Sequence, residues 1–319
     1  MQPGDHSFDH DAAQAAWLYY VGNLSQQEVS DRLGISRFKV LRMLADARER
    51  GFVKVSVEHR TSRTLELSES LQDAFGLTEA QVAPNRGGAS DEKNARDSVG
   101  LLAARYISRV AGHNKKKIIG VGWGRTLSFA ANNVNGIHNP NLTFVSLMGS
   151  ITYASETAPG DVCVRLASQT GGRAVLMPAP FIADTPEDCQ SIMSQRLVRE
   201  AANIAHKADH AFMSVGECKP GSILYESGIF TDHQKAQLRC GDVVGDCCGV
   251  FYRADGSIAD VEVNDCAPCL KPSTMKNADT VLLAGGAGKA VATLAVLRAK
   301  FVKRLFVDEE LAIKLLEIK

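Results

Sequence analysis

The stretch 25–51 constrains the fold of this chain more than any other. Its first half combines a capping-box pattern with apolar residues at helical spacing, in Ser25, Glu28, Val29 and Leu33. Gly34 then indicates a tight turn, after which Ser36 can cap a second helix that ends near Gly51. Two short helices joined by a turn of this kind are typical of a helix-turn-helix.

The second of these helices has one apolar and one polar side at about 100° per residue. The side predicted to face the core carries Val40, Met43, Leu44 and Ala47. A recognition helix reads bases from its N-terminal residues, so the candidates to reach DNA are Ser36, Arg37, Phe38, Lys39 and Arg42. Arginine can pair with guanine, Phe38 can touch a thymine methyl group, and Lys39 suits a phosphate. The alternative is an ordinary amphipathic hairpin with a solvated basic face.

The distribution of charge supports a DNA-binding helix-turn-helix only in the N-terminal part of the chain. The whole chain balances 36 Lys and Arg against 36 Asp and Glu, whereas residues 32–54 hold seven basic and two acidic residues. With 319 residues, 45% of them hydrophobic, the chain is expected to form two domains. We place a DNA-binding domain at 1–58 and a second, larger domain at 59–319, for which the family resemblance described below implies effector binding and oligomerisation.

The N-terminal segment is polar and carries no apolar core of a signal peptide, and no apolar run is long enough to span a membrane. We therefore expect a protein of the cytoplasm without membrane contact. Residues 1–10 are predicted to be a disordered tail and 11–21 a helix packed under the helix-turn-helix. The alternating residues 52–59 predict a strand. It is either a β-wing with Lys54 on a phosphate or a simple connection between the domains.

The region after a predicted helix at 61–76 alternates strands with helices. The predicted strands are 118–121, 142–148, 174–177, 210–215, 280–284 and 305–307. The predicted helices are 91–110, 126–133, 160–170, 191–205, 233–238, 288–298 and 309–316. This order indicates βαβ units and a Rossmann-like α/β fold with a mostly parallel sheet. One hairpin is expected, with strands at 251–253 and 257–263 around the turn 254–256.

Ligands of such sheets lie outside the carboxyl ends of the strands. Four stretches there carry glycines, hydroxyls or charges suited to a sugar or phosphate. The residues concerned are Gly122 and Gly124; Gly149, Ser150 and Thr152, which are expected to offer free backbone N–H donors and two hydroxyls; Asp246; and Lys289. Ordinary turns are the competing interpretation for the first and third stretches. The glycine spacings match neither a dinucleotide fingerprint nor a Walker loop, which argues against a nucleotide cofactor.

Five cysteines require separate consideration: Cys240, Cys247, Cys248, Cys266 and Cys269. Cys266 and Cys269 have the spacing of a zinc knuckle, but a second such pair and a matching histidine are missing from the sequence. Buried free thiols are therefore the default interpretation, ahead of a metal or redox site. We predict neither a metal nor a cofactor.

These motifs together resemble the SorC family of sugar-responsive bacterial transcriptional regulators. The resemblance rests on LSQQEVSDRLGISRFKVLRMLADARERGFV, GVGWGRTL, FVSLMGSI, LMPAPF, GDVVGD and VLLAGGAGKAVATLAVLRAKFVKRLFVDEELA, in this order from about residue 12 to the C-terminus. It implies a helix-turn-helix domain followed by an effector domain similar to phosphosugar isomerases and deaminases. By position, Gly149, Ser150, Thr152, Asp246 and Lys289 would line the effector pocket, and Arg37 and Arg42 would match polar positions of the recognition helix.

The resemblance further implies dimers or tetramers that bind operator DNA of a carbohydrate or polyol operon and respond to a sugar, polyol or sugar phosphate. We expect a transcriptional regulator rather than an enzyme, with repression as the hypothesis and activation left open by the residues as the alternative. The chain departs from the family where Cys266 replaces an arginine and where Ala287 and Gly288 replace acidic residues, which favours an uncharged polyol. The alternative is a sugar-phosphate isomerase or deaminase with an added N-terminal domain.

Overall fold

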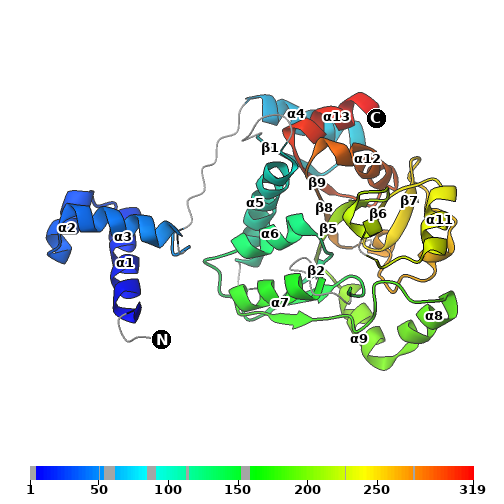
Figure 1. Cartoon of the computed structure of the whole chain (residues 1–319), viewed down its shortest axis with the longest axis horizontal. Coiled ribbons are helices and arrows are strands. Elements are labelled where there is room, and N and C mark those ends of the chain that lie inside the picture. The colour runs from blue at the N-terminus through cyan, green and yellow to red at the C-terminus, as the bar shows by residue number, and fades with distance from the viewer. Residues whose placement is uncertain are drawn as a thin grey trace. The chain divides into compact units, whose positions relative to one another are not determined.

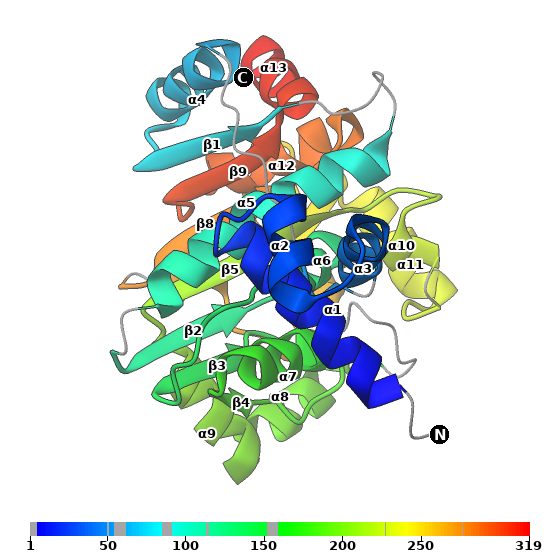
Figure 2. The ribbon, with the colours of Figure 1, turned by 90° about the vertical axis from the view of Figure 1, so that its left-hand side faces the viewer.

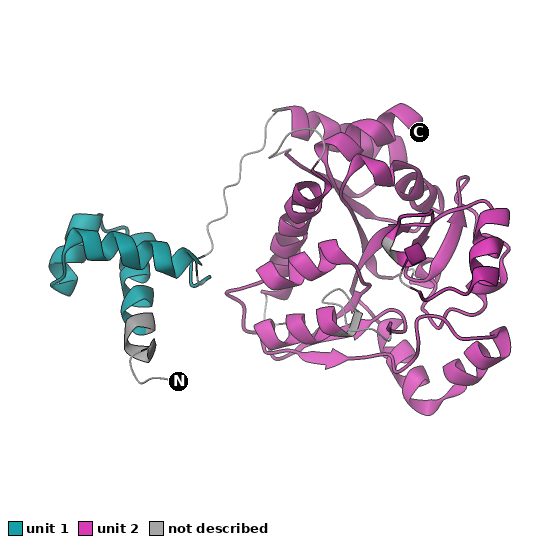
Figure 3. Ribbon diagram, in the orientation of Figure 1, with its two compact units in different colours: residues 1–59 teal, residues 60–319 magenta. Residues whose placement is uncertain are grey.

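A computed structural model describes residues 5–49, 51–53, 62–84, 91–112, 115–151, 159–226, 228–275 and 277–319. Its contacts divide the chain into two compact units, Met1–His59 and Arg60–Lys319 (Figure 3). This division falls within one residue of the boundary expected between 58 and 59. The predicted strand at 52–59 lies almost entirely outside the described residues.

Three helices form the first unit: α1 (Asp5–Tyr20), α2 (Gln26–Leu33) and α3 (Arg37–Glu49). The predicted capping box is present, since the Glu28 backbone N–H donates to Ser25 Oγ at 3.3 Å and the Ser25 N–H donates to Glu28 Oε2 at 2.7 Å. Gly34 ends α2 with a φ of 65°, a conformation that favours glycine. The predicted core face of α3 is confirmed, because Val40, Met43, Leu44 and Ala47 are all buried. Helix α1 starts at Asp5, so the prediction of a disordered tail is wrong for residues 5–10.

The second unit is built on a sheet of seven parallel strands in the order β1-β9-β8-β5-β2-β3-β4, to which β6 and β7 add antiparallel (Figures 1 and 2). The strands are β1 (Glu79–Ala83), β2 (Lys117–Val121), β3 (Leu142–Ser146), β4 (Arg173–Val175), β5 (His210–Glu217), β6 (Val243–Cys247), β7 (Val250–Arg253), β8 (Asp279–Ala284) and β9 (Arg304–Asp308). The predicted α/β fold with a mostly parallel sheet is confirmed.

Helices cover both faces of this sheet. They are α4 (Ser62–Phe75), α5 (Glu92–Ala111), α6 (Arg125–Asn133), α7 (Pro159–Thr170), α8 (Pro186–Ser194), α9 (Arg196–Ala205), α10 (Ile223–Glu226), α11 (Asp232–Cys240), α12 (Ala290–Arg298) and α13 (Glu309–Ile318). Helices α5, α6 and α7 pack on one face, and α4, α9, α12 and α13 on the other. Successive residues of β5 alternate between the two cores, since Phe212 faces the first group and Met213 the second.

Three details differ from the predictions. Strand β1 was missed, because its short sequence EAQVA has no apolar run. The helix predicted at 191–205 is two helices, since Gln195 between them has an extended ψ of 140°. The predicted hairpin is present but shorter than expected: Tyr252 and Ile258 form an antiparallel bridge across the turn 254–256, and the Arg253 and Ala259 N–H groups donate to the Ser257 and Phe251 carbonyls, each at 2.9 Å. The main partner of β7 is β6, which was not predicted as a strand.

Strand β5 continues beyond the parallel sheet. Its first five residues pair with β8, whereas Val215, Gly216 and Glu217 pair antiparallel with β6. The extension therefore stands above the carboxyl edge of the sheet. A two-residue turn, Cys248-Gly249, joins β6 to β7 with positive φ values of 53° and 79°, as a type I′ hairpin turn requires.

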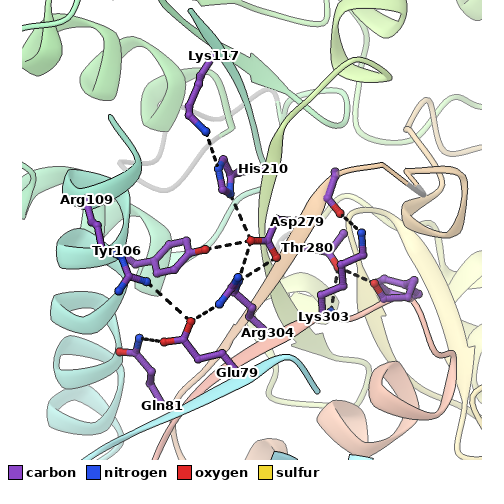
Figure 4. A network of polar contacts seen from close by, with 12 residues as sticks. Glu79, Gln81, Tyr106, Arg109, Lys117, His210, Asp279, Thr280, Lys303 and Arg304 are labelled. Atoms are coloured by element: carbon purple, nitrogen blue, oxygen red, sulfur yellow. Dashed lines mark hydrogen bonds and ion pairs between the residues drawn. The ribbon is translucent and has the colours of Figure 1, made fainter. Parts of the chain in front are cut away.

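The opposite edge carries a polar network that links the first residues of five adjacent strands (Figure 4). Asp279 of β8 accepts hydrogen bonds from Arg304 Nε of β9 at 2.8 Å and from the Tyr106 hydroxyl of α5 at 3.1 Å. Arg304 also pairs with Glu79 of β1. On the other side, His210 Nδ1 of β5 lies 3.7 Å from Asp279 Oδ2, and its Nε2 lies 3.3 Å from Lys117 Nζ of β2. Charged and polar side chains thus tie these strands together at their amino ends.

Candidate functional site

Helix α3 presents the predicted DNA-contacting residues to solvent. Ser36, Arg37, Phe38, Lys39 and Arg42 are all exposed, Phe38 to 82%. Ser36 Oγ accepts a hydrogen bond from the Lys39 backbone N–H at 3.3 Å, so it helps to begin the helix. Arg37 Nε donates to Gln26 Oε1 of α2 at 3.3 Å, which links the two helices. The structure thus brings five of the six predicted DNA-contacting residues together, and the sixth, Lys54, lies outside the described residues.

A cavity of about 370 Å³ opens at the carboxyl ends of β2, β5 and β8. Neighbouring strands β2 and β5 mark the point where the chain changes direction across the sheet, since β3 and β4 follow on one side and β8 and β9 on the other. Open α/β sheets bind ligands at such a point. The extension of β5 forms one wall, through Val215, Gly216 and Glu217.

The lining is strongly charged and of mixed sign. Its cations are Arg96, Arg125, Lys219 and Lys289, and its carboxylates are Glu92, Glu217 and Asp246. Such a surface offers both donors and acceptors of charge-assisted hydrogen bonds. It is suited to a small, highly polar ligand rather than to an apolar one.

Asp246 and Lys289 lie in this cavity, as their predicted role as effector contacts requires. Only 2% of Asp246 is exposed, and burial raises the pKa of its carboxyl to about 6, although the Gly249 backbone N–H donates to Oδ2 at 3.3 Å. Lys289 Nζ donates to the carbonyl oxygen of Val215 at 2.7 Å, and burial lowers its pKa to about 8 against the attraction of Glu217. Perturbed pKa values in a cavity are common at functional sites.

The two glycines of the first predicted loop have different positions. Gly124 lines the cavity and begins α6 with a φ of 125°, and Ser214 Oγ would lie 2.7 Å from any Cβ atom there. Gly122 lies deeper, where its N–H donates to the Phe212 carbonyl at 2.8 Å. A Cβ atom on Gly122 would lie 3.1 Å from Cys248 Sγ, so close packing explains this glycine.

The second predicted loop does not offer the backbone donors expected of it. The Gly149 N–H donates to the Pro268 carbonyl, and the Ser150 N–H donates to the Ala179 carbonyl, each at 2.9 Å. A Cβ atom at Gly149 would lie 1.9 Å from the carbonyl oxygen of Pro180. The prediction of free donors at Gly149 and Ser150 is therefore wrong, because crossing backbone segments occupy them, and Thr152 lies outside the described residues.

Sequence reasoning missed several residues of the cavity. Glu92 and Arg96 come from the first two turns of α5, Arg125 begins α6, and Glu217 ends β5. The available signal was that charged residues lie a few positions after predicted strands, as Arg125 does after 118–121 and Glu217 after 210–215.

The cysteines form no evident site. All eight are free thiols; of the five singled out above, Cys247, Cys248 and Cys266 are buried, Cys269 is half-buried and Cys240 is exposed, contrary to the expectation for Cys240. Within the described ranges, no three His, Cys, Asp or Glu residues are grouped to hold a metal ion. In the same part of the chain, no helix is both long and apolar enough to cross a membrane.

Comparison with known proteins identifies the second unit. Residues 59–317 match the family model Sugar-bind, described as "Putative sugar-binding domain". The chain is 32% identical to the erythritol catabolism regulatory protein EryD of Brucella abortus, over 94% of both chains. It is 27% identical to the deoxyribonucleoside regulator of Bacillus subtilis, over 94% of this chain and 95% of that one.

Solved structures agree in fold. A DeoR family transcriptional regulator from Listeria monocytogenes, 26% identical, covers 79% of this chain with a TM-score of 0.72 and matches over 99% of its own length. The full-length sorbitol operon regulator SorC of Klebsiella pneumoniae, 22% identical, covers 97% of this chain and 99% of its own with a TM-score of 0.71. All four named proteins are described as regulators or regulatory proteins, which agrees with the predicted class. The chain therefore belongs to the SorC family of transcriptional regulators with a sugar-binding domain.

Proposed function

We propose that this protein controls a carbohydrate or polyol catabolic operon by binding operator DNA through α3, with an affinity that changes when a sugar, polyol or sugar phosphate occupies the cavity. The observation that carries this proposal is the charged cavity at the carboxyl ends of β2, β5 and β8, in a chain that also presents an exposed basic helix. Such a regulator works on DNA in the cytoplasm.

The surface of α3 supports the DNA-binding part of the proposal. Arg37, Lys39 and Arg42 supply positive charge on the side of the helix that faces away from its core. Phe38 is a large aromatic residue that the fold leaves uncovered, which suits contact with the apolar part of a partner such as a thymine methyl group. Lysine and arginine also bind phosphates, so the affinity should fall as salt rises.

The cavity supports the effector part. Its volume of about 370 Å³ is in the range of sites for small molecules. Asp246 and the other carboxylates can accept hydrogen bonds from hydroxyl groups, while Arg125 and Lys289 can donate to hydroxyls or to a phosphate. EryD is named for erythritol catabolism, which makes a short polyol the first effector to test.

Regulation requires two states that bind the effector differently. An effector changes DNA affinity only by the difference between its affinities for the DNA-binding state and the other state. We propose a homodimer or homotetramer, because paired half-sites on an operator require a symmetric arrangement of two recognition helices. Light scattering of the full chain measures this assembly directly.

The decisive experiment is a fluorescence anisotropy titration of the full chain with DNA from the promoter region next to its gene. Binding should weaken with salt, and a polyol, sugar or sugar phosphate should shift the binding curve. Absence of salt-dependent binding to every promoter-proximal fragment would contradict the DNA-binding part. DNA binding that no such compound alters would contradict the effector part.

A further inference from the structure

Gly288 lies between two carboxylates of the cavity. A Cβ atom built on this glycine would lie 3.4 Å from Glu92 Oε1 and 3.9 Å from Glu217 Oε1. Both oxygens therefore face the same small volume, although Glu92 comes from α5 and Glu217 from β5. Gly288 is exposed and its φ is not positive, so a larger residue is compatible with its backbone. The absence of a side chain at 288 keeps this volume open.

The two carboxylates are held in place by neighbouring cations. Glu92 Oε2 pairs with Arg96 Nη1 at 3.3 Å, and Glu217 Oε1 pairs with Lys219 Nζ at 2.5 Å. The Arg96 side chain is only 11% exposed, whereas that of Glu92 is 65% exposed and reaches the open side of the cavity. The backbone of α5 at Arg96 packs directly on Gly285, since a Cβ atom there would lie 2.8 Å from Arg96 Cα.

Each carboxylate keeps acceptor capacity after these pairings. Among the described residues, no hydrogen bond reaches Glu92 Oε1, the oxygen that faces the volume above Gly288. Glu217 directs Oε1 toward the same volume; this oxygen already pairs with Lys219, but an ionised carboxylate oxygen has two acceptor positions and can take a further donor. A carboxylate oxygen accepts hydrogen bonds and cannot donate them. A ligand that fills this volume must therefore bring donors, and adjacent hydroxyl groups supply them at the spacing of neighbouring carbons.

We propose that Glu92 and Glu217 determine effector specificity by accepting hydrogen bonds from adjacent hydroxyl groups of the effector, in a volume that Gly288 leaves open. This inference rests on the proposed function, since it concerns the same cavity. A free polyol and its phosphate ester both carry a run of hydroxyl groups on neighbouring carbons, which is the feature that the two carboxylates would recognise. A molecule of the same length without these hydroxyls would displace water from the two carboxylates without replacing its hydrogen bonds, and is therefore discriminated against.

Calorimetric titration of the full chain tests the proposal with erythritol, xylitol, sorbitol, erythritol 4-phosphate and, as the hydroxyl-poor analogue, butane-1,4-diol. The variants are Glu92→Gln, Glu217→Gln and Gly288→Ala. The first two keep the shape of the side chain, and the third places a methyl group in ordinary contact with both carboxylates. Glu200→Gln is the matched control, because Glu200 also pairs with an arginine four residues away, at 2.9 Å, but lies on α9 outside the cavity.

We expect at least one hydroxyl-rich compound to bind the wild type and butane-1,4-diol not to bind. Glu92→Gln and Glu217→Gln should then bind roughly tenfold to a hundredfold more weakly, the usual loss for a hydrogen bond to a charged group. Gly288→Ala should weaken binding by filling the volume, and Glu200→Gln should match the wild type. A compound that changes DNA affinity yet binds all three cavity variants as tightly as the wild type would overturn the specificity proposal alone. If none of the compounds binds or alters DNA affinity, both proposals fail.

Discussion

The buried carboxylate of Asp246 gives a direct test of the charged cavity, because its ionised form should lower the free energy of unfolding of the unliganded protein. The pKa of its carboxyl is about 6 in the folded protein against an ordinary value of 3.8, and the cause is burial. A pKa raised by about two units means that folding disfavours the ionised form by about 3 kcal/mol. Below the ordinary pKa of 3.8 the carboxyl is protonated in the folded and the unfolded state, and it costs no stability. The cost grows as pH rises above that value and is complete above the folded-state pKa of about 6. At pH 7.5 the whole cost is present.

Asp246→Asn should therefore stabilise the unliganded protein while removing its effector response. The amide keeps an oxygen for the Gly249 N–H but carries no charge to desolvate. The expected gain at pH 7.5 is up to about 3 kcal/mol, which corresponds to a rise in Tm of roughly 5 to 10 °C. At pH 5 the gain should fall to about half, since part of the wild-type carboxyl is then protonated.

Thermal unfolding at the two pH values measures this effect, with the exposed Asp260→Asn as control. The control should leave Tm unchanged at both pH values. A variant at Asp246 that is less stable than the wild type at pH 7.5 would refute the reasoning. So would a gain of the same size at pH 5, because the cost would then not arise from ionisation.

Three further predictions concern other parts of the molecule. Arg42→Ala should weaken operator binding by about 1 to 3 kcal/mol in anisotropy titrations without changing Tm, because Arg42 is exposed on α3; unchanged affinity would exclude it from the interface. Gly149→Ala should destabilise the protein by about 3 kcal/mol in denaturant titrations, since its methyl group would overlap the Pro180 carbonyl; wild-type stability would refute that contact. Asp279→Asn should cost about 2 to 3 kcal/mol by the same measurement, because Arg304 and Tyr106 lose a charged acceptor; a neutral result would mean that the network is dispensable.

Local patterns were sufficient to predict the first unit. The capping box at Ser25, the turn at Gly34 and the apolar face of α3 depend on residues a few positions apart, so the sequence records them directly. The alternation of strands and helices in the second unit was predicted from the same kind of local pattern. Strand β1 could not be predicted in this way, because its burial comes from pairing with β9, more than two hundred residues later.

The cavity was only half predictable. Asp246 and Lys289 stood out as charges at strand ends, whereas Glu92 and Glu217 reach the cavity through the packing of α5 and the extension of β5. The sequence suggested that Ala287 and Gly288 remove negative charge from the pocket. In the structure two carboxylates from other elements flank Gly288, so the loss is offset by residues distant in sequence. Gly149 was misinterpreted for a similar reason, since the sequence around it gives no sign that the backbone at Pro180 packs against it.

The polar network at the amino edge of the sheet has a consequence for how such regulators diversify. It ties β1, β9, β8, β5 and β2 together without using any residue of the cavity, which lies at the other edge. Mutations that change which effector binds can therefore accumulate around the cavity at the carboxyl edge, while the polar network at the amino edge continues to hold the strands together. Selection of this protein for a new inducer should yield changes in the first turn of α5 and the end of β5, and leave Asp279 and Arg304 untouched.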